Sequence, residues 1–264
     1  MSSLKTDLRD VVFLIPCRID SLERVRNLKI IVSLLTFWFE TRVMVIEEGP
    51  SPVLHDFFPD RPIGLELYFI EDHSGLFHRS HCVNELIRRT RNPVIANCDV
   101  DVLCSPRNYV RARNLLTKDK FDVLRPFDGR CLNVAQDLAP RLLSERSLDF
   151  LDESNCRLLY PDTPGGLVMV RRDVYLKAGM DNENFVSYGF EDDERLVRLA
   201  GLGYRLGKLE GPLFHLDHPR GVNSHEGLNP HNEANRLELE KVKAMSRDEL
   251  RAYVNSWSWT SAIS

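Results

Sequence analysis

Two carboxylates, Asp99 and Asp101, follow the apolar run 94–96 with one valine between them. In an extended chain, residues i and i+2 project to the same side, so both carboxylates could address one divalent cation. Hard cations such as Mg²⁺ and Mn²⁺ prefer carboxylate oxygens and complete their coordination with water or phosphate. The pair predicts a metal site, although two acids at this spacing also occur as solvated loop residues or helix caps.

A second acidic group lies in YGFEDDE, residues 188–194, where four acids open a predicted helix after Gly189. Acids in the first helical turn are favoured by the helix dipole, so any single one needs no further function. Arg195 and Arg198 are spaced as simple i,i+3 or i,i+4 partners for them. Four acids together exceed what capping requires, which indicates a chemical role for at least one.

Two groups of histidines offer further metal ligands. His215 and His218 in FHLDHPRG follow a predicted strand, but three-residue spacing alone is a weak metal signal. His78 and His81 lie one helical turn apart with Cys82 beside them, which makes a soft-metal site an alternative, but the motif supplies no fourth ligand.

The elements that must position these residues alternate between strands and helices. Strands are predicted at 11–16, 42–47, 65–70 and 93–97, with helices at 21–38 and 78–90 between them. This alternation favours a mostly parallel central sheet flanked by helices, an α/β fold. The Asp99–Asp101 pair then lies at the carboxyl end of the fourth strand, where ligands bind in open α/β sheets.

In the second half of the chain, the hydrophobic periodicity predicts fewer helices and strands. A helix at 106–116 and a strand at 122–126 precede residues 127–164, which we expect to be irregular and to hold an acceptor loop. Gly165 and Gly166 then open a short strand and a helix near Asp173, and Gly201 or Gly203 ends the next helix. An amphipathic helical tail spans 229–256. We expect one catalytic domain over 1–221 and a helical extension, 222–264, packed on it.

Composition excludes several classes of protein. The chain has 264 residues with 35 basic and 39 acidic side chains, and no long basic run that would suggest binding to nucleic acid or anionic membranes. Its six cysteines form no CxxC pair, so we expect reduced thiols rather than a zinc ribbon. The start has no signal-peptide pattern and the most apolar helical stretch, 22–39, carries four charges, which predicts a cytoplasmic protein without a transmembrane segment.

Five segments taken in order resemble inverting glycosyltransferases of the GT-A fold, the nucleotide-diphospho-sugar transferase fold. The likeness is strongest to bacterial family-2-type enzymes and to the β-1,4-galactosyltransferase and chondroitin-polymerase group, and it covers residues 11–221. The segments are IPCRIDSLERVRNL, FHRSHCVNEL, ANCDVDVL, GGLVMVRRDVYLKAGMDNENFVSYGFEDDERLVRL and FHLDHPRG.

The resemblance implies a nucleotide-diphospho-sugar donor, a UDP-sugar in the first instance, a Mn²⁺ or Mg²⁺ ion, and a glycan or other hydroxyl acceptor. Direct displacement would invert the anomeric centre. The implied positions are Pro16 and Arg18 near the nucleotide, Arg79 and Asn84 near the nucleotide or donor sugar, Asp99 and Asp101 on the metal, Gly165 and Gly166 beside the sugar and acceptor, and His215 or His218 as the remaining metal ligand.

The resemblance also makes Asp192 the general base, and the helix dipole favours its ionised form in a first turn. Glu191 projects roughly 100° away around the helix and suits hydrogen bonds to sugar hydroxyls. Asp193 and Glu194 are expected to be helix-start or solvent-facing acids. Tyr188-Gly-Phe190 replaces the tryptophan- and glycine-rich approach of the galactosyltransferases, so the acceptor identity does not carry over.

Two other functions stay open. A nucleotidyltransferase would need a glycine- and lysine-rich loop after the first strand, and IPCRID has neither residue. A catalytically silent sugar-nucleotide-binding or assembly subunit would keep the fold, although intact acids at every motif argue against decay. The P-loop pattern is absent and Gly201, Gly203 and Gly207 miss the GxGxxG spacing. The donor sugar, the acceptor and the oligomeric state are not determined by the sequence.

Overall fold

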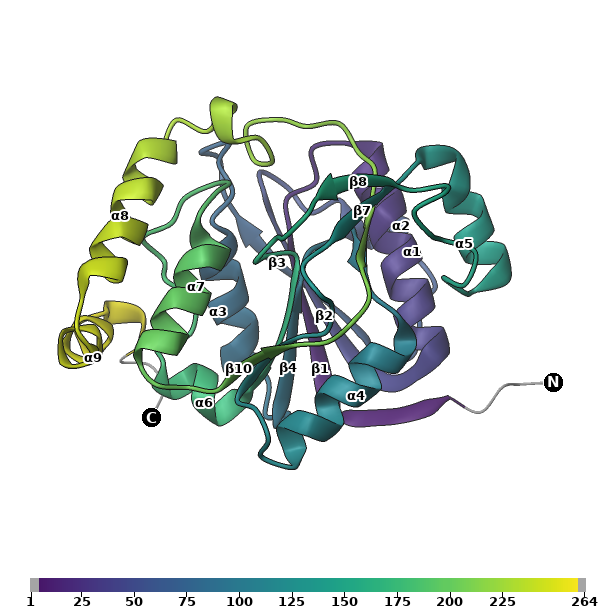
Figure 1. Cartoon of the computed structure of the whole chain (residues 1–264). Coiled ribbons are helices and arrows are strands. Elements are labelled where there is room, and N and C mark those ends of the chain that lie inside the picture. Colours follow the sequence, from purple (N-terminus) through teal and green to yellow (C-terminus); the bar gives the residue numbers. More distant parts are fainter. Residues whose placement is uncertain (1–4, 261–264) are drawn as a thin grey trace.

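The computed structural model describes residues 5–260, so the outer ends of the two expected domains, 1–4 and 261–264, lie outside the described residues. Its main sheet has seven strands in the order β10-β6-β9-β4-β1-β2-β3 (Figure 1). All neighbours are parallel except β9, which is antiparallel to both β4 and β6. The predicted mostly parallel α/β sheet is confirmed. The strands are β1 (Thr6–Cys17), β2 (Phe39–Gly49), β3 (Leu65–Glu71), β4 (Val94–Cys98), β6 (Val123–Arg125), β9 (Leu167–Arg171) and β10 (Leu206–Lys208).

Helices cover both faces of this sheet, and β1 shows why. Its alternate residues enter two separate apolar clusters, Phe13 and Ile15 in one and Val12 and Leu14 in the other. A strand buried on both faces reads as a continuous apolar run. Figure 1 shows α1, α4 and α5 on one side and α3 with α6 to α9 on the other. The helices are α1 (Leu22–Trp38), α2 (Leu54–Phe57), α3 (Arg79–Arg89), α4 (Pro106–Thr117), α5 (Ala139–Glu145), α6 (Arg172–Lys177), α7 (Glu191–Gly201), α8 (Asn232–Ala244) and α9 (Arg247–Asn255).

A second, four-stranded sheet contains much of the region expected to be irregular. Its order is β5-β11-β7-β8, and β7 and β8 lie within 127–164 together with α5. The expectation is wrong for these elements because each is too short to show periodicity and because β7 pairs with β11, about 80 residues later in the chain. The strands are β5 (Val102–Leu103), β7 (Cys131–Val134), β8 (Arg157–Tyr160) and β11 (Leu213–Leu216).

The small sheet brings two motifs together. In the antiparallel pairing of β11 with β5, His215 lies opposite Val102, the residue after Asp101. The backbone N–H of Leu216 also donates to the carbonyl of Asp101 at 2.8 Å. The histidine segment is therefore held beside the acidic turn by main-chain pairing.

The tail helices α8 and α9 pack beside α7 on the outer side of the main domain (Figure 1). Val254 and Trp257 are buried in the same cluster as Tyr175 of α6. The rings of Trp257 and Trp259 stack with centroids 4.8 Å apart, so Trp257 packs in the core. Within residues 5–260, no helix is both long and apolar enough for a membrane crossing.

The tight contact between Gly179 and α9 gives a test of whether the tail folds with the main domain. Gly179 has φ +86°, and a Cβ there would lie 2.6 Å from Val254 and 2.9 Å from Trp257. We expect Gly179→Ala to destabilise the whole protein by about 1–3 kcal/mol, through left-handed backbone strain and overpacking. Thermal unfolding followed by circular dichroism measures this effect.

The matched control is Gly221→Ala, since a Cβ there meets no atom within 4 Å and the backbone is not left-handed. Its melting temperature should stay near that of the wild type. A separate early transition in Gly179→Ala, with the main transition unchanged, would contradict a single cooperative unit.

Candidate active site

One cavity at the carboxyl ends of the main-sheet strands gathers almost all of the predicted site residues. The end of β1, the turn after β4, the double glycine, the start of α7 and the segment after β11 all contribute to its wall. The predicted residues that line it are Pro16, Arg18, Arg79, Asp99, Asp101, Gly165, Gly166, Glu191, Asp192, His215 and His218.

Asn84 is the exception. Its amide nitrogen donates to the carbonyl of Asp181 at 2.9 Å and to Glu183 Oε1 at 2.8 Å, and its amide oxygen accepts from the backbone N–H of Asp181 at 2.9 Å. Arg79 begins α3 and reaches the cavity, whereas Asn84 lies on a buried face further along the helix. The expected position of Asn84 near the donor is therefore wrong, and its contacts are structural.

Asp99 and Asp101 both line the cavity but have different partners. The chain turns at residues 100–101, and of the two acids only Asp101 lies with other possible metal ligands. Asp99 Oδ1 accepts from Arg79 Nη2 at 2.7 Å and Nε at 3.0 Å. Asp101 Oδ2 lies 3.1 Å from His218 Nε2, and its Oδ1 lies 3.9 Å from His215 Nε2.

Asp101, His215 and His218 form a buried cluster whose possible ligand atoms all lie within 4.8 Å of one another. Both histidines take part, where the sequence left open a choice between them. Burial alone would raise the pKa of Asp101, but His215, His218 and Arg24 outweigh it and hold that pKa well below its usual range. Burial lowers the pKa of His215 to about 4. An ionised carboxylate and a neutral imidazole are the forms that bind metal ions.

Asn133 on β7 sets the orientation of His215. The Asn133 Oδ1 lies 3.0 Å from His215 Nδ1, and since an amide oxygen only accepts, Nδ1 carries the proton. The lone pair of His215 is then on Nε2, which faces Asp101. Such an outer contact fixes the tautomer of a metal-binding histidine.

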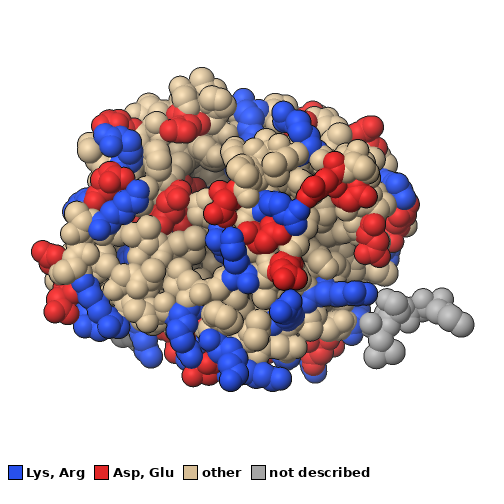
Figure 2. Space-filling model, viewed as in Figure 1, with Lys and Arg blue, Asp and Glu red and all other residues tan. Residues whose placement is uncertain are grey.

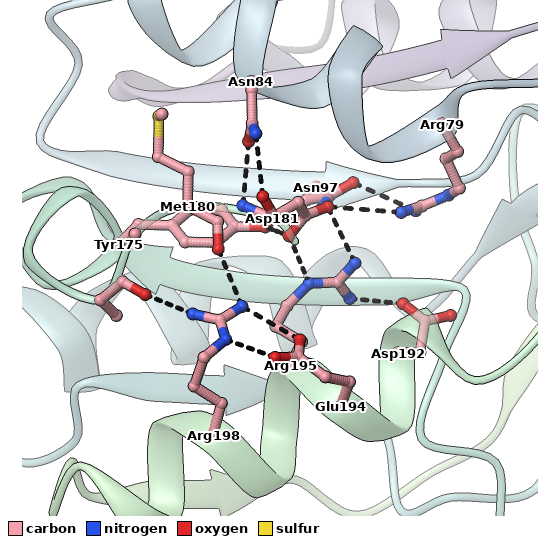
Figure 3. A network of polar contacts seen from close by, with 12 residues as sticks. Arg79, Asn84, Asn97, Tyr175, Met180, Asp181, Asp192, Glu194, Arg195 and Arg198 are labelled. Atoms are coloured by element: carbon pink, nitrogen blue, oxygen red, sulfur yellow. Dashed lines mark hydrogen bonds and ion pairs between the residues drawn. The ribbon is translucent and has the colours of Figure 1, made fainter. Parts of the chain in front are cut away.

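The start of α7 is held by buried arginines (Figure 3). Arg195 is only 3% exposed and pairs with Asp192, while its Nε and Nη2 donate to the two oxygens of Asp181 at 2.7 and 3.0 Å. Arg198 pairs with Glu194 at 2.7 Å. Glu194 lies in the first helical turn, which is one of its two expected positions, but at 1% exposure it does not face solvent. The spacing arguments for Arg195 and Arg198 thus describe real ion pairs, which lie in the core.

Gly165 is required by the position of Asp192. A Cβ at Gly165 would lie 1.9 Å from Asp192 Oδ2, so only glycine lets the carboxylate come this close to the loop. The Asp99 backbone N–H donates to the carbonyl of Gly166 at 2.8 Å, which connects the double glycine to the acidic turn. The glycine pair therefore lies between Asp99 and Asp192.

Glu191 and Asp192 differ in their electrostatics. Burial, and then the adjacent Asp192 charge, raises the pKa of Glu191 to about 7. Burial also opposes ionisation of Asp192, but Arg195 and Arg79 outweigh it and lower its pKa. At neutral pH, Asp192 is ionised while Glu191 is partly protonated and can donate as well as accept.

Several cavity residues were missed by sequence reasoning. Arg24 in the first turn of α1 lies 3.5 Å from Asp101, and as one of four charged residues in that helix it was not distinguished by the sequence. Arg220 lay inside the quoted histidine motif without a role. Tyr160 comes from the short strand β8, which no sequence pattern predicted.

The alternative soft-metal group does not assemble. His78 lies 3.1 Å from Glu48 and His81 lies 3.0 Å from Glu183, while Cys82 is buried. His78 instead belongs to a cluster with Glu48 and Asp72, which already contains a cation, because Arg18 lies 3.0 Å from Asp72.

The raised pKa of Glu191 predicts a pH-dependent effect on stability. Glu191 ionises near its usual pKa in the unfolded chain but only near pH 7 in the folded protein. Its contribution to the free energy of unfolding is therefore complete at low pH and is lost as pH rises through about 7. The free energy of unfolding of Glu191→Gln, minus that of the wild type, should therefore increase by up to roughly 3 kcal/mol from pH 5 to pH 8. Urea unfolding at both pH values measures this difference.

Glu240→Gln on α8 is the control, since Glu240 is exposed and pairs with Lys243 on the surface. It should show no comparable change between the two pH values. A Glu191→Gln difference that stays constant from pH 5 to pH 8 would contradict the raised pKa.

Comparisons with known proteins agree with this architecture. Residues 145–219 match a family described as the N-terminal domain of galactosyltransferase, while no curated protein sequence matches the chain significantly. The mannosyltransferase PcManGT from Pyrobaculum calidifontis, solved with GDP-Man and Mn²⁺, superposes with a TM-score of 0.58 at 13% identity, over 99% of this chain and 71% of that one. The catalytic domain of Drosophila β1,4-galactosyltransferase 7, solved with xylobiose, gives 0.47 at 17% identity, over 77% and 64%. The matched segment and the fold shared with the mannosyltransferase together support a GT-A-like glycosyltransferase.

Proposed function

We propose that this protein is a metal-dependent inverting glycosyltransferase, which moves a sugar from a nucleotide-diphospho-sugar to a hydroxyl acceptor by direct displacement. The observation that carries the proposal is that one cavity holds the Asp101–His215–His218 cluster, several arginines and the ionised Asp192. Such a reaction needs charge neutralisation at a departing diphosphate and a base at the incoming hydroxyl. The cavity contains candidates for both.

The donor side of the cavity is rich in arginine. Arg18, Arg24, Arg79 and Arg220 all line it, and guanidinium groups suit phosphate oxygens. Arg79 is 9% exposed and its Nη1 has no hydrogen-bond partner among the described residues. We assign the nucleotide diphosphate to this side, with Pro16 at the end of β1 beside the nucleotide.

The mixed donor set of the cluster suits Mn²⁺ better than Mg²⁺. Asp101 would supply a carboxylate oxygen, and His215 and His218 imidazole nitrogens, whereas Mg²⁺ prefers oxygen ligands. When bound, the ion would supply Lewis-acid neutralisation of charge on the leaving group. Asp99 is assigned to orient Arg79, and through it the donor, instead of coordinating the ion.

The base assignment rests on protonation and placement. Asp192 is ionised, half-buried at the cavity wall and fixed by Arg195, so it would accept the proton of the acceptor hydroxyl. Glu191 lies beside it and would hydrogen-bond to sugar hydroxyls. Gly165 and Gly166 would border the transferred sugar and the acceptor.

The metal assignment predicts different effects for the two acids of the turn. Asp101→Asn, His215→Ala and His218→Ala should each weaken Mn²⁺ binding at least ~10-fold, since each removes a ligand. Asp99→Asn should have a smaller effect, because Asp99 pairs with Arg79 and is not in the cluster. Calorimetric titration with Mn²⁺ in the presence of UDP measures this. The reverse order of the two aspartate variants would move the site to Asp99.

The base assignment predicts separate effects on binding and on transfer. Asp192→Asn should lower transfer at least ~10²-fold and leave donor affinity nearly unchanged, whereas Glu191→Gln should have a smaller effect on the rate. Purified protein is incubated with Mn²⁺ and a panel of UDP-sugars and GDP-mannose, the nucleotide sugar of the mannosyltransferase complex. Release of the nucleoside diphosphate and product formation are followed, with donor affinity measured by calorimetry.

The same panel separates the competing functions. Donor binding without any turnover would favour the silent binding subunit, and formation of a nucleotide sugar from a nucleoside triphosphate and a sugar phosphate would favour a nucleotidyltransferase. Near-normal transfer by Asp192→Asn, with matching thermal stability, would exclude Asp192 as the base. A loss confined to Glu191→Gln would move that role to Glu191.

A further inference from the structure

A second groove, which we name the outer groove, continues the cavity beyond Asp192. It lies between the end of β8 with the following loop, residues 160–165, and residues 188–193, which lead into α7 and form its first turn. Glu226 closes one side. Tyr160, Thr163, Gly165, Tyr188, Glu191 and Asp192 belong to both walls. The two spaces thus form one continuous cleft with the proposed base at the junction.

The two parts of the cleft differ in charge. The cavity contains both acids and four arginine side chains, whereas the outer groove is lined by acids and by no lysine, arginine or histidine of the described residues. Figure 2 shows acidic side chains around a hollow on this face. The acids of the outer groove are Asp162, Glu191, Asp192, Asp193 and Glu226.

Nearby cations neutralise only part of this charge. Asp162 lies 3.5 Å from Arg125 and 3.9 Å from Lys208, and Asp192 pairs with Arg195. Among residues 5–260, Asp193 and Glu226 form no ion pair within 4 Å, although the charges of Lys243 and Arg125 act on Asp193 from further away. The two acids come from different segments of the groove wall, the first turn of α7 and the segment that closes one side, so a ligand in the groove meets negative charge from both.

We propose that the outer groove binds the acceptor and selects a sugar that is neutral or carries an amino group, against one that carries a carboxylate, sulfate or phosphate. This inference rests on the proposed function, which places the donor diphosphate among the arginines and leaves the outer groove for the acceptor. Like charges brought together at a binding surface suppress wrong partners, and here the acids repel an anionic acceptor. Tyr160 and Tyr188 at the junction offer ring surfaces to the apolar face of a sugar.

The test compares three acceptors that share one ring and differ in charge: methyl glucoside, methyl glucosaminide and methyl glucuronide. For each acceptor, the rate of nucleoside diphosphate release is measured with Mn²⁺ and the best donor of the panel. The rate without acceptor, which reports hydrolysis by water, is subtracted. We expect the neutral and amino glycosides to react at least ~10-fold faster than the glucuronide at low salt, and the ratio to shrink at high ionic strength.

The double variant Asp193→Asn/Glu226→Gln should reduce this discrimination at least ~3-fold, mainly by raising the rate with the glucuronide. Glu240→Gln, which removes one acid from the outer face of α8, is the matched control and should leave the ratio unchanged. Equal or faster reaction with the glucuronide, an unchanged ratio in the double variant, or no acceleration by either of the other glycosides would overturn the proposal.

If donor hydrolysis continues, none of those outcomes contradicts the proposed function, because hydrolysis needs the cavity and not the outer groove. Absence of donor binding and of hydrolysis would instead overturn the proposed function itself.

Discussion

The buried ion pairs at the carboxyl edge of the main sheet are the constraint on which the site depends. Asp181 accepts from Arg195, which also pairs with Asp192 (Figure 3). Arg79 pairs with Asp99, and its Nη1 lies 3.7 Å from Asp181. Both arginines are buried, so each needs its carboxylates; loss of one partner from such a pair typically costs about 3–5 kcal/mol. The network joins α3, the turn after β4 and α7, and it thereby fixes the proposed base relative to the proposed donor site.

The small sheet is a second, independent support. Main-chain pairing of β11 with β5 and β7 holds His215 beside Asp101 and places Asn133 against the other nitrogen of that imidazole. Of the three possible ligands, His215 lies on a strand, while Asp101 is in the turn before β5 and His218 follows β11. The buried ion pairs thus position the proposed base, and the paired strands position one ligand of the proposed metal site and the turn that carries another.

The site contains two pairs of neighbouring acids, Glu191 with Asp192 and Asp99 with Asp101. The two carboxylates of each pair have different surroundings, which explains how they can act differently. Glu191 is half-buried and lies beside a negative charge, so its pKa rises, whereas Asp192 faces two arginines and its pKa falls. Asp99 and Asp101 likewise diverge, one toward an arginine and the other toward two histidines. Charge in the cleft also differs between its two parts, since all of its arginines line the cavity and the outer groove has only acids among its charged lining residues.

By itself, the sequence determined the α/β class, the mostly parallel sheet and the acids and histidines of the cavity, because apolar runs buried on both faces and acids after a strand are local patterns. The other predicted cavity residues, among them Arg79 and the double glycine, came from the resemblance to a family. Only the tertiary structure decided that Asp99 turns to Arg79, that both His215 and His218 join Asp101, and that Asn84 and Glu194 belong to the core. It also decided the short strands β7 and β8. These features depend on pairing between segments far apart in the chain, and neither spacing nor periodicity contains the direction of a side chain after a turn.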